Sequence, residues 1–233
     1  DPLWSRGLGD VYKRQDTDQL KDWILHNPLL VFAYNKAIGT TISDTRVDPV
    51  SDKDDDKIAK EFLNTWDNRT HSAFEASVER VYAVTTPRTP HHPSGNKKIL
   101  WHGTDYFAAG CIIQGGFKVG HAKNGRLLGD GVYFADVASK VMQYISKSFG
   151  HGDDAGIVFV CEVDMGNMLT IAADGSNSSL QTSWMNHGYD SVYMPRGTPY
   201  SGRRLLNSEY CVKDPKRIKI LYVMDMTRKR TGR

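Results

Sequence analysis

The apolar segments of this chain are short and rich in β-branched and aromatic residues, and this feature constrains the fold more than any other. Each segment is long enough for one strand and far too short for a membrane span. The helical patterns between them show no regular βαβ alternation. We therefore predict an α+β domain in which helices pack on two sheets. The predicted strands are Phe74–Thr85, Lys97–Trp101, Gly156–Val163, Tyr189–Met194, Ser208–Val212 and Ile218–Met224.

The segment Phe74–Thr85 has a clear period of two, in which apolar side chains alternate with polar ones. Successive side chains of a strand point to opposite faces, so this pattern predicts a strand with one buried face. The residues expected on that face are Phe74, Ala76, Val78, Tyr82 and Val84.

Helical spacing of apolar residues predicts helices over Asp16–Pro28, Ile58–Trp66 and Tyr106–Gln114. Ser43–Asp56 is polar and acid-rich and is expected to be a linker or surface loop. Phe117–Gly129 is rich in glycine and basic residues and predicts a second loop.

A further helix is expected to run from Asp136, a suitable N-cap, to about Phe149. Four apolar or aromatic positions at helical spacing would share one face of it. These positions are Val137, Val141, Tyr144 and Ile145.

The length of 233 residues fits one domain with a short N-terminal extension. Residues 1–15 have no initiator Met and no periodicity, so we expect them to be foreign to the fold. Residues 16–57 would form a short helical and linker region, 58–226 the main domain and 227–233 a basic tail. The net charge of +3 permits contact with nucleic acid without indicating it. No segment is expected to enter a membrane.

Three short motifs each carry one side chain suited to a pocket for a large polar ligand. His102 lies in Leu-Trp-His-Gly-Thr, Tyr133 in Gly-Asp-Gly-Val-Tyr-Phe-Ala-Asp, and Glu209 in Asn-Ser-Glu-Tyr. Taken singly, each is more often explained by a structural role, as a hydrogen-bonded histidine, a strand aromatic or a sheet-edge carboxylate. Together and in this order they favour a binding site with an imidazole, a flat aromatic face and a carboxylate.

Other nucleotide and metal motifs fail their tests. Gly150–Ala155 matches GxGxxA, but a predicted strand follows it where a dinucleotide fold needs a helix, and there is no P-loop. The acidic run from Asp52 imitates a calcium loop but has Lys57 in place of the required Gly. His91 and His92 have no nearby thiolate, and the three cysteines show no CxxC spacing. We therefore expect no metal site.

The three motifs, in this order and spacing, resemble the His-Tyr-Glu signature of the poly(ADP-ribose) polymerase branch of the diphtheria-toxin-like ADP-ribosyltransferases. The resemblance covers about Ile58–Met226 and includes the segment Asn64–Thr85. It implies the ADP-ribosyltransferase fold, with two packed and mainly antiparallel sheets flanked by helices, and not a Rossmann fold. It also implies NAD+ as substrate, without a metal, and transfer of ADP-ribose to protein acceptors, including the enzyme itself.

The resemblance also implies roles for the motif residues. Breaking the bond between nicotinamide and ribose develops positive charge on the ribose, and Glu209 would stabilise it. Tyr133 and Tyr144 would present their ring faces to nicotinamide from two sides. His102 would bind the adenine-side ribose.

Further cofactor-binding positions follow from the same resemblance. The backbone of Gly103 would pair with the carboxamide, Thr104 would contact a ribose, and Arg126 would face the diphosphate. The family usually has a Ser three residues before the stacking Tyr, where this chain has Val141. Recognition of nicotinamide should then rest more on Gly103 and on stacking.

Several alternatives remain open from the sequence. Glu209 is compatible with polymer elongation, with mono-transfer and with transfer to nucleic acid. The chain could instead be a catalytically weak module that binds NAD+ or ADP-ribose, or an NAD+ glycohydrolase, and the acceptor-side segment Asp174–Arg204 does not decide among these. The sparse cysteines fit an intracellular compartment, and the basic tail does not separate nuclear from cytoplasmic.

Overall fold

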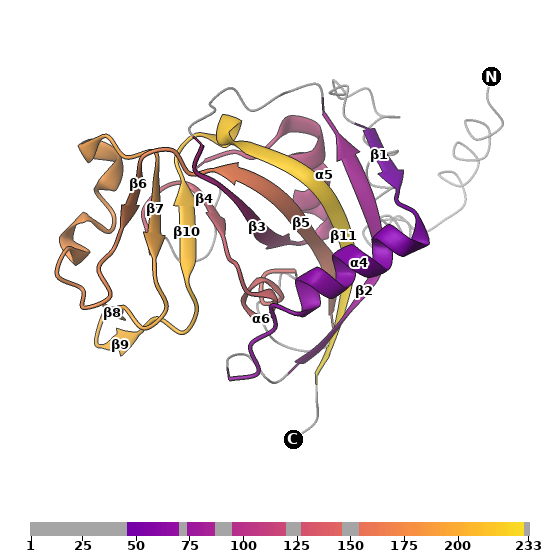
Figure 1. Cartoon of the computed structure of the whole chain (residues 1–233), viewed down its shortest axis with the longest axis horizontal. Helices are drawn as coiled ribbons and strands as arrows, with labels where there is room; N and C mark the ends of the chain where they lie inside the picture. The colour runs from indigo at the N-terminus through magenta and orange to yellow at the C-terminus, as the bar shows by residue number, and fades with distance from the viewer. Residues whose placement is uncertain (1–45, 70–73, 87–94, 120–126, 146–153, 231–233) are drawn as a thin grey trace, which may run out of the picture.

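Two separate β-sheets form the framework of the protein (Figure 1). The computed structural model describes residues 46–69, 74–86, 95–119, 127–145 and 154–230. The helix expected over residues 16–28 and the segment 1–15 lie outside this part of the chain.

The larger sheet has five strands in the order β1-β2-β11-β5-β3, and every neighbouring pair is antiparallel. Its long central strands are rich in β-branched residues, as the sequence predicted. The strands are β1 (Arg46–Pro49), β2 (Phe74–Thr85), β3 (Lys97–Thr104), β5 (Asp154–Asp164) and β11 (Ile218–Arg230).

The smaller sheet has four strands in the order β4-β10-β7-β6, of which only the β6–β7 pair is parallel. A two-stranded hairpin of β8 and β9 accompanies it. The prediction of an α+β fold with two mainly antiparallel sheets is therefore confirmed. The strands are β4 (Val132–Phe134), β6 (Met168–Thr170), β7 (Ser191–Met194), β8 (Pro199–Tyr200), β9 (Arg203–Arg204) and β10 (Glu209–Val212).

A pair of backbone hydrogen bonds joins the edges of the two sheets. The amide of Trp101 on β3 donates to the carbonyl of Ala135, directly after β4, at 2.9 Å, and the amide of Ala135 donates back at 3.0 Å. This contact fixes the relative position of the strands that carry His102 and Tyr133.

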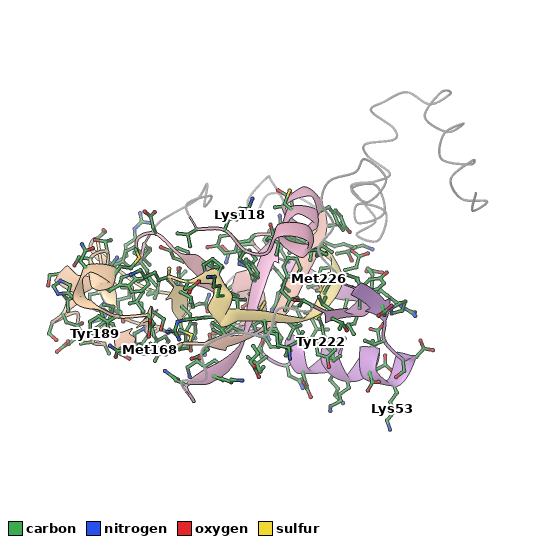
Figure 2. The ribbon with its side chains drawn as sticks, turned by 90° about the horizontal axis from the view of Figure 1, so that it is seen from above. Lys53, Lys118, Met168, Tyr189, Tyr222 and Met226 are labelled. Atoms are coloured by element: carbon green, nitrogen blue, oxygen red, sulfur yellow. The ribbon has the colours of Figure 1, made fainter. Side chains whose placement is uncertain are left out.

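Helices α4 (Asp52–Leu63) and α5 (Tyr106–Gly115) cover opposite faces of the larger sheet (Figure 2). Phe62 of α4 packs in one apolar cluster with Trp101, and Ile113 of α5 packs in another with Phe159. The remaining helical elements are α6 (Ala138–Val141), η1 (Ser178–Leu180), η2 (Trp184–His187) and η3 (Pro215–Arg217). No helix in the described ranges is long and apolar enough to cross a membrane.

The prediction of a loop over Ser43–Asp56 is wrong from residue 46 onward. Residues 46–49 form β1, and α4 begins at Asp52. The side chain of Ser51 accepts a hydrogen bond from the amide of Asp54 and caps the helix. The acidic residues that indicated a loop occupy the first turn, where the helix dipole favours negative charge.

Strand β2 has the predicted bounds, but its apolar residues do not share one face. Asp225 of β11 pairs with Arg80 while the next residue pairs with Val78, so Glu79 is an extra residue in the ladder. Such a bulge reverses the alternation of side chains. Val78 therefore packs on the α4 side of the sheet, whereas Val84 packs on the α5 side.

The helix expected from Asp136 to about Phe149 is much shorter in the described residues, where α6 covers only Ala138–Val141. Asp136 is not its N-cap, because the helix begins one residue later than predicted; its carboxylate instead accepts a hydrogen bond from the hydroxyl of Tyr210 at 3.0 Å. The cap position is Val137, which makes no side-chain cap bond.

Candidate active site

The residues predicted to form the site converge where the two sheets meet. Strand β3 ends with His102, Gly103 and Thr104, and its neighbour across the junction, β4, carries Tyr133. Strand β10 pairs with β4 and begins at Glu209. Helix α6 follows β4 directly and contributes Lys140 and Val141, with Tyr144 one turn further on.

His102 connects the motifs of β3 and β4. Its Nδ1 lies 2.8 Å from the backbone carbonyl oxygen of Tyr133. A carbonyl only accepts, so Nδ1 carries the proton and Nε2 is the free acceptor of the neutral ring. The ring packs edge-on against Phe117 and Phe134. Burial lowers the pKa of His102, although the Tyr133 carbonyl opposes this shift, and the neutral form is therefore favoured at neutral pH.

Tyr133 is held through its hydroxyl group. The hydroxyl accepts a hydrogen bond from the amide of Leu128 at 2.8 Å and donates to the carbonyl of Gly129 at 2.7 Å. Burial raises the pKa of this hydroxyl, so it stays protonated. With the hydroxyl engaged in the loop before β4, the ring is what Tyr133 can offer to a ligand.

Glu209 forms a largely buried ion pair with Lys140. The Lys140 Nζ lies 2.9 Å from the Glu209 Oε1, and the two side chains are 16% and 13% exposed. The same ammonium lies 5.5 Å from the centre of the Tyr144 ring. Burial alone would lower the pKa of Lys140, but the charge of Glu209 and the contact with Tyr144 raise it above its ordinary value. The structure thus brings Glu209 and Tyr144 together through a residue that the sequence prediction missed.

The position of Lys140 in the sequence contained a usable signal. It lies four residues before Tyr144, so the two share a face of a helical turn. A lysine on the same face as a predicted ligand-binding aromatic is a candidate ion-pair partner for the carboxylate of the site, which is Glu209.

Gly103 and Val141 touch across the junction of β3 and α6. A methyl group on Gly103 would overlap the carbonyl oxygen of Val141 and lie 2.9 Å from its Cγ1. The prediction that Val141 contributes to the carboxamide edge stays a prediction. The structure adds that Val141 is only 2% exposed and belongs to the apolar cluster under α4.

The other predicted site residues are less informative. Thr104 is the last residue of β3 and is half-buried. Arg126 lies outside the described residues, as do His91 and His92. Among the described residues, no group of three or more His, Cys, Asp or Glu side chains could hold a metal ion.

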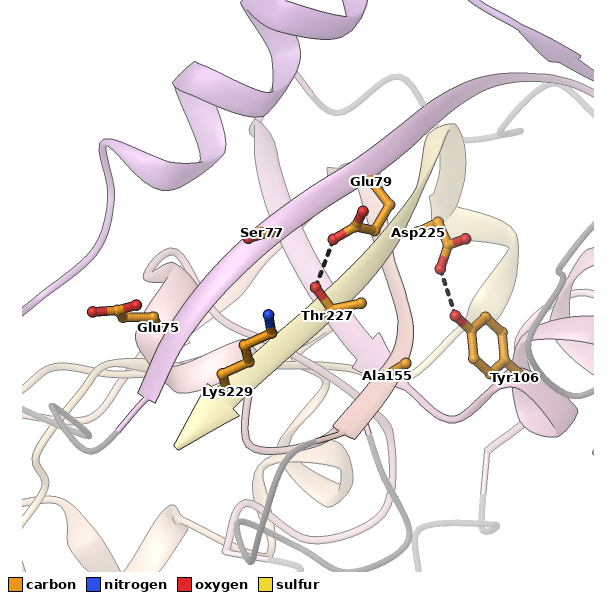
Figure 3. A pocket seen from close by; sticks show the side chains of 8 residues that line it. All are labelled: Glu75, Ser77, Glu79, Tyr106, Ala155, Asp225, Thr227 and Lys229. Carbon is orange, nitrogen blue, oxygen red and sulfur yellow. Dashed lines mark hydrogen bonds between the residues drawn. The ribbon is translucent and has the colours of Figure 1, made fainter. Parts of the chain in front are cut away.

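An open groove of about 530 Å³ lies elsewhere, on the α5 side of the larger sheet (Figure 3). Its walls include Glu79, which accepts from Thr227 at 2.6 Å, and Asp225, which accepts from Tyr106 at 2.5 Å. None of the predicted site residues lines it. The candidate site is therefore defined by the convergence of residues and not by this groove.

Comparison with known proteins gives a consistent result. A model of the poly(ADP-ribose) polymerase catalytic domain matches residues 53–228. Poly [ADP-ribose] polymerase 1 of Gallus gallus is 24% identical over 205 residues, which cover 76% of this chain and 20% of that protein. Poly [ADP-ribose] polymerase 2 of Arabidopsis thaliana is 26% identical over 76% of this chain and 32% of its own length.

A third relative is the protein mono-ADP-ribosyltransferase PARP3 of Mus musculus, which is 32% identical over 44% of this chain and 18% of its own length. The chain thus spans between about a fifth and a third of the length of these relatives.

Proposed function

Because this chain belongs to the family of poly(ADP-ribose) polymerase catalytic domains, we propose that it is an NAD+-dependent ADP-ribosyltransferase. The observation that carries the proposal is the buried Lys140–Glu209 pair, which lies beside Tyr144. A carboxylate held in a partly buried site is suited to a reaction in which positive charge develops nearby.

The reaction would proceed by cleavage of the bond between the ribose C1′ and the nicotinamide nitrogen. The bonding electrons leave with nicotinamide, and the ribose acquires oxocarbenium character. Glu209 would stabilise that charge and hydrogen-bond the ribose 2′-hydroxyl. A nucleophilic oxygen or nitrogen of the acceptor then bonds to C1′, and its proton is released.

Lys140 has two consequences for this step. Its ammonium balances the charge of Glu209 before substrate arrives, so the carboxylate is not left buried alone. It also fixes the direction of the carboxylate, because a hydrogen-bonded ion pair at 2.9 Å allows few side-chain conformations.

The binding of NAD+ would use the groups around this pair. Tyr133 and Tyr144 would cover the nicotinamide ring, the backbone of Gly103 would pair with its carboxamide, and His102 would bind the adenine-side ribose. Thr104 would add a ribose contact, and Arg126 would face the diphosphate. The tight approach of Val141 to Gly103 places this valine beside the proposed carboxamide contact.

The acceptors would be protein side chains, including those of the enzyme itself. The names of the relatives include both polymerases and a mono-ADP-ribosyltransferase. Glu209 is compatible with either outcome, and also with transfer to nucleic acid.

The test is to incubate the protein with NAD+ labelled in the adenosine half and to analyse the products by gel and mass spectrometry. We expect labelled protein, as ladders if polymer forms and as discrete bands if transfer stops at one unit. Free ADP-ribose alone would indicate an NAD+ glycohydrolase. Unchanged NAD+ that nevertheless binds would indicate a binding module and contradict the proposal.

A further inference from the structure

Helix α6 is too short to hold its own position. It has four residues, and its N-cap residue, Val137, provides no side-chain hydrogen bond. Isolated helices of this length do not persist in water. The contacts that keep α6 in place must therefore come from other elements.

The N-terminal end of α6 is held by the loop that follows α4. Thr65 Oγ1 accepts a hydrogen bond from the amide of Ala138 at 2.9 Å and donates to the carbonyl of Phe62 at 2.7 Å. The Ser139 hydroxyl accepts from the amide of Asp67 at 3.3 Å. Thr65 thus performs from a distant segment the capping function that Val137 lacks.

The C-terminal end of α6 is held by Arg228, near the end of β11. Its Nη1 donates to the carbonyl oxygen of Met142 at 2.6 Å, and its guanidinium lies 4.8 Å from the centre of the Phe74 ring. Arg228 is only 1% exposed, and so is Met142. A guanidinium at this end of a helix is favoured by the partial negative charge of the terminal carbonyls.

The carbonyl that Arg228 holds lies in the middle of the segment used by the site. Lys140 precedes Met142 by two residues and pairs with Glu209, and Tyr144 follows it by two. The preceding carbonyl, of Val141, is the one that lies against Gly103. A small displacement of this turn would therefore shift all the nicotinamide-side groups at once. His102 would not shift with them, because it is held separately by the Tyr133 carbonyl.

We propose that Arg228 is a positioning residue for the nicotinamide side of the site, acting through the Met142 carbonyl on the turn that carries Lys140, Val141 and Tyr144. This inference rests on the proposed function. It does not require Arg228 to touch NAD+. Loss of Arg228 should weaken the binding of ligands on the nicotinamide side and leave the binding of ligands on the adenosine side unchanged.

The experiment measures affinity for benzamide, which probes the nicotinamide side, and for ADP, which probes the adenosine side. The variants are Arg228→Met, which loses the guanidinium, and Thr65→Val, which loosens α6 from its other end. The control is Val223→Ala, which removes apolar volume from the same strand on the α5 side of the sheet. Thermal unfolding of all four proteins identifies temperatures at which each is folded.

We expect Arg228→Met to weaken benzamide binding by about tenfold, as for loss of one charge-assisted hydrogen bond, while ADP affinity stays within about twofold. Thr65→Val should show the same selectivity at smaller magnitude, and Val223→Ala should show none. If Arg228→Met does not fold, Arg228→Lys is measured in its place, because it keeps the charge but loses the planar guanidinium.

An equal loss of affinity for benzamide and for ADP in the Arg228 and Val223 variants would overturn the inference, because a general structural role predicts that result. So would unchanged benzamide affinity in folded Arg228 and Thr65 variants. A wild-type protein that binds neither ligand would contradict the proposed function itself, and with it this inference.

Discussion

At the scale of single residues, the chemistry of the site depends on how three polar side chains are held. Glu209 is paired with Lys140, His102 is bonded to the Tyr133 carbonyl, and the Tyr133 hydroxyl is engaged by the loop before β4. Each of these side chains is oriented by a partner within the protein. Groups that are oriented before the substrate arrives do not have to reorganise during the reaction.

Val141 gives a prediction at this scale. Val141→Ser would place a hydroxyl beside Gly103, where we expect it to donate to the carboxamide. One neutral hydrogen bond is worth about 0.5–1.5 kcal/mol, or roughly two- to twelvefold tighter benzamide binding. The buried methyl groups are lost at a cost on the order of 1 kcal/mol of folding stability. Titration with benzamide and with ADP is the measurement, and equal benzamide affinity in the two proteins would place Val141 outside the nicotinamide pocket.

His102 gives a prediction for the pH dependence of stability. Burial lowers the pKa of His102 in the folded protein, so the unfolded chain takes up this proton first, at about pH 6.5. The contribution of the neutral His102 ring to the free energy of unfolding is therefore complete above that pH. It is lost as the pH falls through the lowered pKa, by at most about 1.4 kcal/mol per pH unit.

The measurement is thermal or denaturant unfolding of wild type and His102→Gln at about pH 7.5 and about pH 5.5. Wild type should lose more stability over this interval than the variant. An identical loss would show that the ring titrates normally in the folded state.

The sequence predicts His102, Tyr133 and Glu209 as site residues because each lies in a distinctive motif. The contacts that hold these side chains are visible only in the structure. The only local signal for Lys140 is its spacing of four residues from Tyr144, and this signal is weak because a lone lysine in a helix is usually a solvated surface residue. Its pairing with Glu209 spans 69 residues and depends on the tertiary structure.

At the scale of elements, long-range contacts override local patterns. The strands were predictable because their β-branched and aromatic runs have strand length and are bounded by turn-forming residues. The bulge at Glu79 could not be predicted, because it arises from the register between β2 and β11. Similarly, α6 ends early in a segment whose helical spacing favoured a longer helix, and its caps come from Thr65 and Arg228.

Ser51 gives a prediction at this scale, since it makes the α4 helix begin where a loop was expected. Ser51→Ala removes the side-chain oxygen that accepts from the Asp54 amide. We expect a loss of about 0.5–2 kcal/mol in the free energy of unfolding, with ligand affinity unchanged. Ser51→Asp should retain most of the stability, because aspartate caps equally well. If Ser51→Ala were as stable as wild type, the cap would contribute nothing.

At the scale of the whole molecule, the site depends on how the two sheets are joined. One connection is the backbone pair of Trp101 and Ala135. Another is Arg217, which lies 3.6 Å from Asp164 at the end of β5 and 2.9 Å from Asp190 just before β7. Asp164 is only 2% exposed, so its charge depends on partners within the protein. The sequence indicated two sheets, but contacts between residues so far apart in the chain have no local pattern.

Arg217 gives a prediction at this scale. Arg217→Met removes the guanidinium that lies 3.6 Å from the buried Asp164 carboxylate, and we expect a loss on the order of 2 kcal/mol in the free energy of unfolding. The double variant Arg217→Met with Asp164→Asn should recover part of that loss, because it also removes the charge of the carboxylate. Urea unfolding is the measurement. Strict additivity of the two single variants would show that the pair is not coupled.

Release of nicotinamide measures the proposed reaction itself, in which Glu209 stabilises the charge on the ribose while NAD+ is cleaved. Wild type and Glu209→Gln are compared at equal occupancy by NAD+, after their folding and ADP affinity have been matched. We expect wild type to release nicotinamide and the variant to be slower by roughly 30- to 1,000-fold, which corresponds to about 2–4 kcal/mol in the activation barrier. Equal rates in the two folded proteins, or no release by wild type that binds NAD+, would contradict this proposal.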